Sequence, residues 1–315
     1  MYSTQLIIFL QKIQNPFLNN LMNYITFLGY EVGVTIILCI YLFGFSFHKG
    51  FFVAQSSFLT FVSTDILKNA FMVRRPFLMD KNVLNLDKSM IKEVSQGFVS
   101  YSFPSGHSSG ITAVLGSISL SVRKRWFYIL SSILIFLTMF SRLYLGVHYL
   151  RDVLVGFSLG IIAILLYYIP LRNYIENSRN FPFNLTLERK GKLTYFIFFI
   201  LLPFLLIFIP ITFDKSQVGL LIGINLGYLL LAINFKTSYI EYKRKFLPII
   251  LRIIIGFSFY LILRFGLSFL FKIIFPEKLL EITYFRVVRY FLVGLFTVGL
   301  SITTFIKFNL AYKVE

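Results

Sequence analysis

Charged residues are scarce in this sequence, and acidic ones are the scarcest. Only 14% of the 315 residues are charged, whereas a soluble domain typically carries about 25%. Hydrophobic residues make up 57% of the chain, and phenylalanine alone occurs 39 times. This shortage of charge excludes an ordinary water-soluble fold, because lipid must cover apolar side chains that no water-soluble core of this length can bury.

Cysteine occurs once, as Cys39, so no disulfide can form within the chain. The chain has 13 acidic and 31 basic residues, which gives a net charge of +18. Such a charge in a soluble protein would point to nucleic acid. Here Lys and Arg gather between apolar runs, as in loops beside anionic membrane lipids. We therefore expect membrane lipids as partners and no nucleic acid.

Nine apolar segments are candidates for membrane-spanning helices, each of which needs about 20 mostly apolar residues. The third segment is short and rich in Ser and Gly. The sequence thus predicts an all-α, polytopic membrane bundle. The nine segments are 22–44, 51–70, 105–121, 126–145, 152–170, 193–212, 217–234, 247–270 and 284–306.

Three regions follow from the spacing of these segments. Residues 1–21 are expected to hold an amphipathic helix, over about 3–18, that lies at the membrane interface. Residues 22–170 would form a five-span core, and 171–315 an extension of four spans. The long connection 71–103 carries several charged residues and is expected to lie in water.

Lys and Arg in short loops predict orientation, because cytoplasmic loops are enriched in them. The two faces carry nearly equal numbers in the nine-span arrangement. One face becomes the more basic once three cations of the motifs described below, Lys68, Arg75 and Arg142, are set aside. That face includes the run Arg123–Arg125. We expect it to be cytoplasmic, which places the motifs on the extracytoplasmic side.

Three short motifs fall on that other face. Charged groups at or within membrane spans are costly and indicate function by default. In the first motif, Lys68 and Arg75 are seven residues apart, about two helical turns, and can share a face of a helix that Pro76 then ends. Arg offers a planar fork and Lys a point charge to a phosphate dianion.

The second motif, residues 104–107, reads Pro-Ser-Gly-His and is expected to open a helix. The backbone N–H groups of Ser105 and Gly106 would lie at a positive helix end, which is a ready anion site. His107 would face the same anion and donate a proton to it.

The third motif holds Arg142, His148 and Asp152. His148 and Asp152 are four residues apart and are expected on one helix face. The carboxylate would accept a hydrogen bond from one ring N–H, which fixes the tautomer and leaves the other nitrogen as a nucleophile. Arg142 would hold phosphate oxygens.

Lys-x6-Arg-Pro, then Pro-Ser-Gly-His, then Ser-Arg-x5-His-x3-Asp together resemble the type 2 phosphatidic acid phosphatase (PAP2) superfamily over roughly residues 50–165. This superfamily includes lipid phosphate phosphatases, glucose-6-phosphatase and vanadium haloperoxidases. The nine-span layout is similar to that of sphingosine-1-phosphate phosphatases and of glucose-6-phosphatase.

The resemblance implies a metal-independent and cofactor-free phosphatase. His148 would attack phosphorus and form a phosphohistidine, and Asp152 would orient it. His107 would protonate the leaving oxygen and then activate water. The phosphate oxygens would be held by Lys68, Arg75, Ser105, Gly106 and Arg142. The sequence agrees in having no carboxylate cluster suited to a divalent metal beside the motifs.

Three functions stay open at this stage. The first is hydrolysis of a lipid phosphate or lipid diphosphate that enters from the bilayer. The second is hydrolysis of a soluble ester such as glucose-6-phosphate, although Asp152 departs from the glucose-6-phosphatase pattern and favours the lipid branch. The third is a phospholipid-binding or transport protein that does no chemistry, although binding alone does not need both His107 and His148.

Overall fold

The structure, a computed structural model, describes residues 3–97, 99–177, 193, 195–210, 213–235, 239–280 and 282–314. It divides into two compact units. Unit 1 comprises Met1–Ile37, Leu59–Tyr167 and Ile211–Phe213, and unit 2 comprises Leu38–Phe58, Tyr168–Pro210 and Asp214–Glu315. Boundaries between the units fall within the helices α3 (Glu31–Cys39), α4 (Phe47–Phe71) and α9 (Leu150–Asn177).

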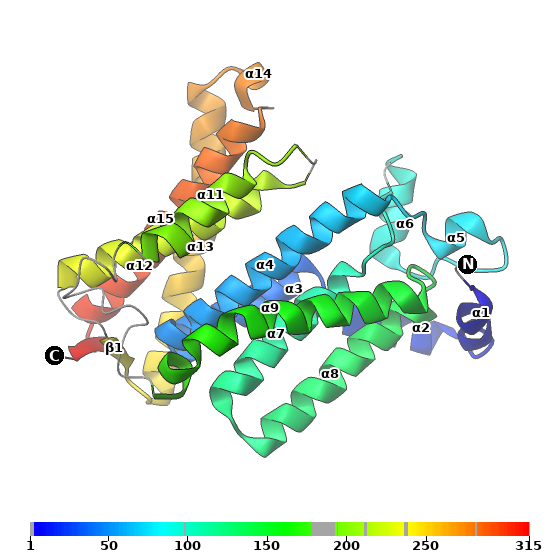
Figure 1. Cartoon of the computed structure of the whole chain (residues 1–315), viewed down its shortest axis with the longest axis horizontal. Helices are drawn as coiled ribbons and strands as arrows, with labels where there is room; N and C mark the ends of the chain where they lie inside the picture. Colours follow the sequence, from blue (N-terminus) through cyan, green and yellow to red (C-terminus); the bar gives the residue numbers. More distant parts are fainter. Residues whose placement is uncertain are drawn as a thin grey trace. The chain divides into compact units, whose positions relative to one another are not determined.

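Unit 1 is built from helices of the first half of the chain (Figure 1). Polar side chains begin several of them. The side chain of Asn15 accepts the amide of Leu18 just ahead of Pro16, and Asp87 and Ser105 cap their helices in the same way. The helices are α1 (Gln5–Gln11), α2 (Pro16–Phe27), α3 (Glu31–Cys39), α4 (Phe47–Phe71), α5 (Pro76–Met79), α6 (Lys88–Ser95), α7 (Gly106–Val122), α8 (Arg125–Tyr144) and α9 (Leu150–Asn177).

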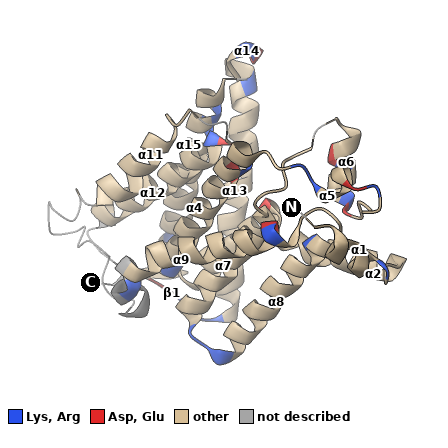
Figure 2. Cartoon of the chain, turned by 45° about the vertical axis from the view of Figure 1, so that its right-hand side comes forward, with Lys and Arg blue, Asp and Glu red and all other residues tan. Residues whose placement is uncertain are grey.

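The helices α7 and α8 run antiparallel and join at a tight turn (Figure 1). Arg123 adopts the left-handed conformation there and ends α7. Figure 2 shows basic residues at this turn and few charges along the bodies of the two helices. A small core of Met22, Met90, Tyr144, Leu145 and Val147 lies among α2, α6 and the end of α8. This core supports the segment 145–149 that carries His148.

Unit 2 contains mostly helices of the second half of the chain. Its most extensive helix packing joins α12 (Lys215–Phe235) and α15 (Thr283–Lys307). Three glycines of α12 recur every fourth residue at this contact, and a Cβ at Gly219 or Gly223 would collide with backbone carbonyls of α15. The described elements are η1 (Ile40–Phe45), η2 (Ile197–Leu201), α11 (Leu202–Leu206), α12 (Lys215–Phe235), β1 (Tyr239–Tyr242), α13 (Phe246–Ile274), α14 (Glu277–Leu280), α15 (Thr283–Lys307) and β2 (Ala311–Val314).

Only two short strands occur in the described ranges, and β1 pairs with β2 in antiparallel register, Tyr239 opposite Val314. The prediction of an all-α membrane fold is confirmed. Within the described part of the chain, six helices are long and apolar enough to span a membrane, and a seventh span arises if α2 and the helix over 31–45 are counted together across their 54° bend.

The count of nine spans stays a prediction. The helix α7 has 17 residues and is short for a span, and the apolar helix over 197–206 is shorter still. Part of the predicted segment 193–212 lies outside the described residues. The N-terminal region differs from expectation, because two helices, α1 and α2, replace the single helix predicted over 3–18.

The guanidinium of Arg252 joins separate segments of unit 2. It is buried and donates to four backbone carbonyls, those of Phe43 (3.1 Å), Gly44 (2.7 Å), Lys243 (3.0 Å) and Leu310 (2.8 Å). Its charge also lies over the ring of Tyr242, at 4.3 Å from the centroid. The first two carbonyls lie at the end of η1 and therefore lack N–H donors within it.

Arg252→Met should destabilise unit 2, because each carbonyl left without a donor costs about 1–3 kcal/mol and partial relaxation leaves a net loss of about 2–4 kcal/mol. The measurement is thermal unfolding in detergent, followed by the loss of monodisperse protein. Arg244→Met, on an exposed arginine of the same unit, is the control. Equal unfolding temperatures for the two variants would contradict the prediction.

Candidate active site

The residues of the three motifs lie together in unit 1. Arg75, Arg142, His148 and Asp152 are all almost fully buried. The charges of Lys68, Arg75 and Arg142 act on both His107 and His148. The helix α4, the segment before α7 and the turn between α8 and α9 therefore bring two histidines, a carboxylate and three cations together from distant parts of the sequence.

The ring of His148 is held in one tautomer. Its Nε2 lies 3.4 Å from Nη1 of Arg75, and because arginine only donates, Nε2 must accept and carries no proton. The proton is then on Nδ1, which lies 3.5 Å from Oδ2 of Asp152 and 3.4 Å from Oγ of Ser102. This arrangement leaves the Nε2 lone pair on the side where the cations gather.

The turn over 145–149 places His148. Gly146 has φ of +77°, in the left-handed region that favours glycine. A Cβ at this position would also collide with the carbonyl oxygen of Leu84. His148 lies in this turn, two residues before α9 begins at Leu150. The expectation that His148 and Asp152 share a helix face is therefore wrong, although their side chains do meet.

Asp152 lies in the first turn of α9 and has several roles there. Its Oδ2 accepts the backbone N–H of Tyr149 at 2.9 Å, as a side chain at the third helical position reaches back to the N-cap. The same oxygen accepts a short hydrogen bond from the hydroxyl of Ser102. The carboxylate is thus fixed by its own helix start and by the segment ahead of α7.

Arg75 lies in an extended segment, not on α4 as expected. The helix α4 ends at Phe71, and Met72 follows with φ of +48°. Pro76 begins α5 at its first position, so the prediction that it ends the Lys68 helix is wrong. From the extended segment Arg75 donates to the carbonyl of Ser100 (2.8 Å), the hydroxyl of Ser100 (2.7 Å) and the carbonyl of Val147 (3.0 Å).

The start of α7 supplies a different pair of amides from the predicted one. Ser105 is the N-cap, and its own N–H donates to the carbonyl of Asp152 at 3.0 Å. The expectation that this amide binds phosphate is wrong for that reason. Gly106 and His107 occupy the first helical positions, where amides have no acceptor inside the helix. Gly106 and His107, not Ser105, therefore offer N–H groups to an anion.

His107 packs between α2 and α3. Its ring meets that of Tyr30 edge to face, with centroids 4.3 Å apart. A Cβ at Gly29 would lie 2.8 Å from the Cβ of His107, so only glycine permits this approach. Nε2 of His107 is buried and has no partner within the described part of the chain. It can therefore exchange a proton with a bound group.

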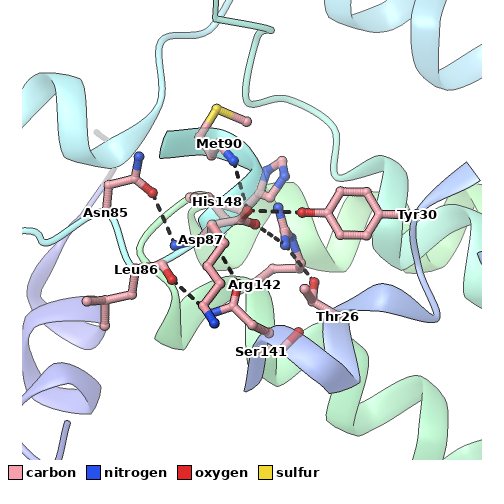
Figure 3. Close-up of polar contacts among 12 residues, drawn as sticks. Thr26, Tyr30, Asn85, Leu86, Asp87, Met90, Ser141, Arg142 and His148 are labelled. Atoms are coloured by element: carbon pink, nitrogen blue, oxygen red, sulfur yellow. Dashed lines mark hydrogen bonds and ion pairs between the residues drawn. The ribbon is translucent and has the colours of Figure 1, made fainter. Parts of the chain in front are cut away.

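Arg142, at the end of α8, is held by residues outside the motifs. Its Nη1 donates to the hydroxyl of Thr26 (2.6 Å) and to Oδ2 of Asp87 (2.7 Å), as Figure 3 shows. Asp87 was expected in water with the rest of 71–103, but it is buried. Sequence reasoning also missed Ser100 and Ser102, which no pattern distinguishes from ordinary loop serines. The only local signal at Asp87 is that of a helix cap ahead of α6.

Burial holds the pKa of His148 well below its ordinary value, and the charges of Arg75, Arg142 and Lys68 lower that pKa further. The imidazole is therefore neutral at neutral pH. Among the described residues, no group of three His, Cys, Asp or Glu side chains could hold a metal ion. The positive charge of the site comes from its arginines and its lysine.

A neutral imidazole whose unprotonated nitrogen faces buried cations, inside an α-helical membrane protein, is an arrangement suited to phosphoryl transfer. Two family models match the chain: the PAP2 superfamily over residues 49–175, and the transmembrane extension of PAP2 superfamily phosphatases over 215–313. The chain belongs to the PAP2 superfamily, as the motifs indicated.

Among characterised proteins, the chain is similar to phosphatidylglycerophosphatase B of Bacillus subtilis (strain 168). The two are 32% identical over 169 residues, which cover 49% of this chain and 75% of that protein. Two crystal structures are also similar. LpxE of Aquifex aeolicus is 24% identical, with a TM-score of 0.45, over 52% of this chain and 93% of that one. A PAP2-type phosphatidylglycerolphosphate phosphatase of Bacillus subtilis is 26% identical, also with a TM-score of 0.45, over 56% and 86%.

Ser102→Ala should lower kcat, because it removes a hydrogen bond to the buried Asp152 carboxylate and an acceptor near Nδ1 of His148. A hydrogen bond to a charged group contributes about 1.5–3 kcal/mol, so we expect a loss of about tenfold or more. Phosphate release under saturating substrate measures it. Ser95→Ala, in α6, is the control, since its exposed hydroxyl only donates to the Lys92 carbonyl. Equal kcat values for the two variants would show that Ser102 does not orient the pair.

Proposed function

We propose that this phosphatase hydrolyses a lipid phosphate or lipid diphosphate through a phosphohistidine on His148, without a divalent metal. The observation that carries the proposal is the polarity of the His148 ring, with Nε2 accepting from Arg75 and Nδ1 facing Asp152 and Ser102. An imidazole oriented in this way has a lone pair ready for attack, and its partner carboxylate stabilises the charge that develops.

In the first step, the Nε2 lone pair attacks phosphorus and the ester P–O bond breaks. The bound phosphate dianion offsets the charge of the neighbouring cations and so favours the protonated form of His107. His107 gives this proton to the leaving oxygen, so the lipid alcohol departs neutral. In the second step, water gives a proton to His107 and its oxygen attacks phosphorus. The P–N bond breaks, its electron pair returns to Nε2, and inorganic phosphate leaves. His107 ends each cycle protonated, as it began.

Three cations supply the charge that a metal supplies elsewhere. Lys68, Arg75 and Arg142 all act on His148, and two of them are buried, where electrostatic interactions are stronger than in water. The amides of Gly106 and His107 add fixed donors at a helix start. Such a set suits a phosphate dianion that gains charge at its equatorial oxygens.

The substrate class is proposed from two observations. The site residues border or lie within candidate spans, so an ester at membrane-surface depth can reach them from the bilayer. The similar protein phosphatidylglycerophosphatase B acts, by name, on phosphatidylglycerophosphate. The charge of the loops supports an extracytoplasmic site, since the run Arg123–Arg125 lies at the other ends of α7 and α8.

His148→Ala should abolish phosphate release, because no nucleophile remains. The assay uses detergent-purified protein in EDTA with short- and long-chain lipid phosphates, an isoprenoid diphosphate and glucose-6-phosphate. We expect release from a lipid substrate by the wild type only. A short-chain lipid phosphate added outside right-side-out vesicles should also be hydrolysed if the site is extracytoplasmic.

Other results of this assay point elsewhere. Release only from glucose-6-phosphate would establish a soluble substrate, and loss of release in EDTA that metal restores would overturn metal independence. No release from any substrate would favour a phospholipid-binding protein. A phosphoryl group found covalently bound to His148→Ala after incubation with substrate would show that another residue carries the intermediate.

The pH dependence of kcat/KM should reflect the depressed pKa of His148, because only the neutral ring attacks. An ordinary histidine has a pKa of about 6.5, so the acid limb should lie below that pH. Arg75→Gln should move the limb of its residual activity to higher pH, since one cause of the depression is removed. Ionisation of the substrate is common to both proteins and cancels. An acid limb above pH 6.5 that Arg75→Gln leaves in place would contradict the assignment.

A further inference from the structure

Asp87 is a buried carboxylate that belongs to none of the three motifs. It lies between α5 and α6 and is 0% exposed. Its Oδ1 accepts the amide of Met90 at 2.9 Å, which caps α6, and the hydroxyl of Tyr30 at 3.0 Å. Its Oδ2 accepts from Arg142 at 2.7 Å. Figure 3 shows the carboxylate between the cap of α6, the Tyr30 ring and the Arg142 guanidinium.

The segment that carries Asp87 is fastened to the N-terminal helices. The side-chain amide of Gln11 donates to the carbonyl of Leu84 and accepts its N–H, both at 2.9 Å. Asn23 donates to the carbonyl of Leu86 at 2.9 Å, and the amide of Leu86 donates to Leu145 at 3.1 Å. These contacts tie the segment to α1, α2 and the turn that holds His148. Asp87 therefore has a defined position relative to the site.

The contacts of Arg142 divide its guanidinium into two parts. Both N–H groups of Nη1 are used, one by Asp87 and one by Thr26. Nε is buried and has no partner among the residues that the structure describes. A buried donor without a partner costs about 1–3 kcal/mol, so its position calls for an acceptor. The Nε edge of Arg142 is the part left for phosphate oxygens.

The negative charge of Asp87 also balances part of the positive charge of the site. Burial alone raises the pKa of Asp87, but the charge of Arg142 and bonds from the Met90 amide, Arg142 and Tyr30 lower it to below the ordinary value. The carboxylate is therefore ionised. Its charge also acts on Arg75. It offsets part of the repulsion among three cations that would otherwise push their side chains apart.

We propose that Asp87 is a positioning residue, which holds the Arg142 guanidinium with its Nε edge toward the phosphate, and that Tyr30 and Thr26 complete this support. Asp87 touches neither the substrate nor His148 in this role and acts only through Arg142. The assignment rests on the proposed function, since the phosphate of that reaction is what Arg142 would bind. The competing explanation is that Asp87 serves only as the cap of α6.

A double-mutant cycle with Arg142 separates these explanations. Asp87→Asn keeps an oxygen for the Met90 amide but loses the charge and presents an N–H group to Arg142. We expect kcat/KM to fall between about 10- and 100-fold, because misplacing a group by about 1 Å can cost ~100-fold. In an Arg142→Ala background the same change should have an effect of less than about twofold. Asp80→Asn, on a carboxylate of the same segment that accepts from Thr4, is the matched control and should change kcat/KM by less than about twofold in either background.

A second variant, Tyr30→Phe, keeps the proposal testable if Asp87→Asn does not fold. Tyr30→Phe removes one hydrogen bond to Asp87 and keeps both the α6 cap and the ring that packs on His107. It should lower kcat/KM severalfold in the wild-type background only. Tyr24→Phe, on an exposed tyrosine, is its control. Equal losses with and without Arg142, for either test variant, would overturn the positioning role in favour of a purely structural one.

Binding of inorganic phosphate tests the proposal without turnover. Millimolar phosphate should raise the unfolding temperature of the wild type, and Asp87→Asn should reduce that shift while Asp80→Asn leaves it unchanged. If the wild type hydrolyses nothing, the proposed function fails, but this comparison still decides the role of Asp87. Equal shifts in wild type and Asp87→Asn, or no shift in the wild type, would overturn it.

Discussion

The site depends on one buried guanidinium, that of Arg75. It donates to Ser100 ahead of α7, to Val147 in the turn before α9 and to Nε2 of His148. Three segments distant in sequence are thereby joined around one charge. Because arginine has donors only, the contact with His148 also determines which ring nitrogen is unprotonated. The architecture of the site and the tautomer of His148 thus follow from the same side chain, whose desolvation is offset by its carbonyl and hydroxyl partners.

Unit 2 uses a buried guanidinium for a different purpose. Arg252 spends its N–H groups on four backbone carbonyls and lies against the ring of Tyr242. Arg142 in unit 1 has a buried Nε without a partner in the described residues. In a membrane protein both arrangements start from the same cost of removing a charge from water. Hydrogen bonds to backbone carbonyls offset that cost for Arg252. For Arg142, hydrogen bonds to Asp87 and Thr26 offset part of the cost, and Nε keeps an unused donor.

Much of the candidate site could be predicted from the sequence, because its residues form spaced motifs at the ends of apolar runs. What failed was local geometry. Met72 and Gly146 adopt positive φ values. As a result Arg75 lies beyond the end of α4, and His148 lies in the turn before α9. Hydrophobic spacing does not report such turns. Asp87 escaped notice for another reason: its burial follows from the docking of α1 and α2 on its segment, a tertiary contact without periodicity. The bend between α2 and α3 was hidden within a single apolar run.

The buried polar atoms without a hydrogen-bond partner in the described residues are of two kinds, rotatable hydroxyls and groups of fixed geometry. In the described residues some belong to helix hydroxyls, such as Ser131 and Ser301, which can rotate toward nearby carbonyls at little cost. Of the four that are not hydroxyls, Oε2 of Glu93 lies in α6, outside the motifs. The other three, Nε2 of His107, Nε of Arg142 and Oδ1 of Asp152, are fixed by ring, guanidinium or carboxylate geometry and cannot rotate away. All three belong to the motifs. Each costs free energy in the unliganded protein, about 1–3 kcal/mol for a neutral group and more for a charged one. A phosphate that bonded to His107 and Arg142 would remove two of these costs on binding, and their removal would add to its affinity.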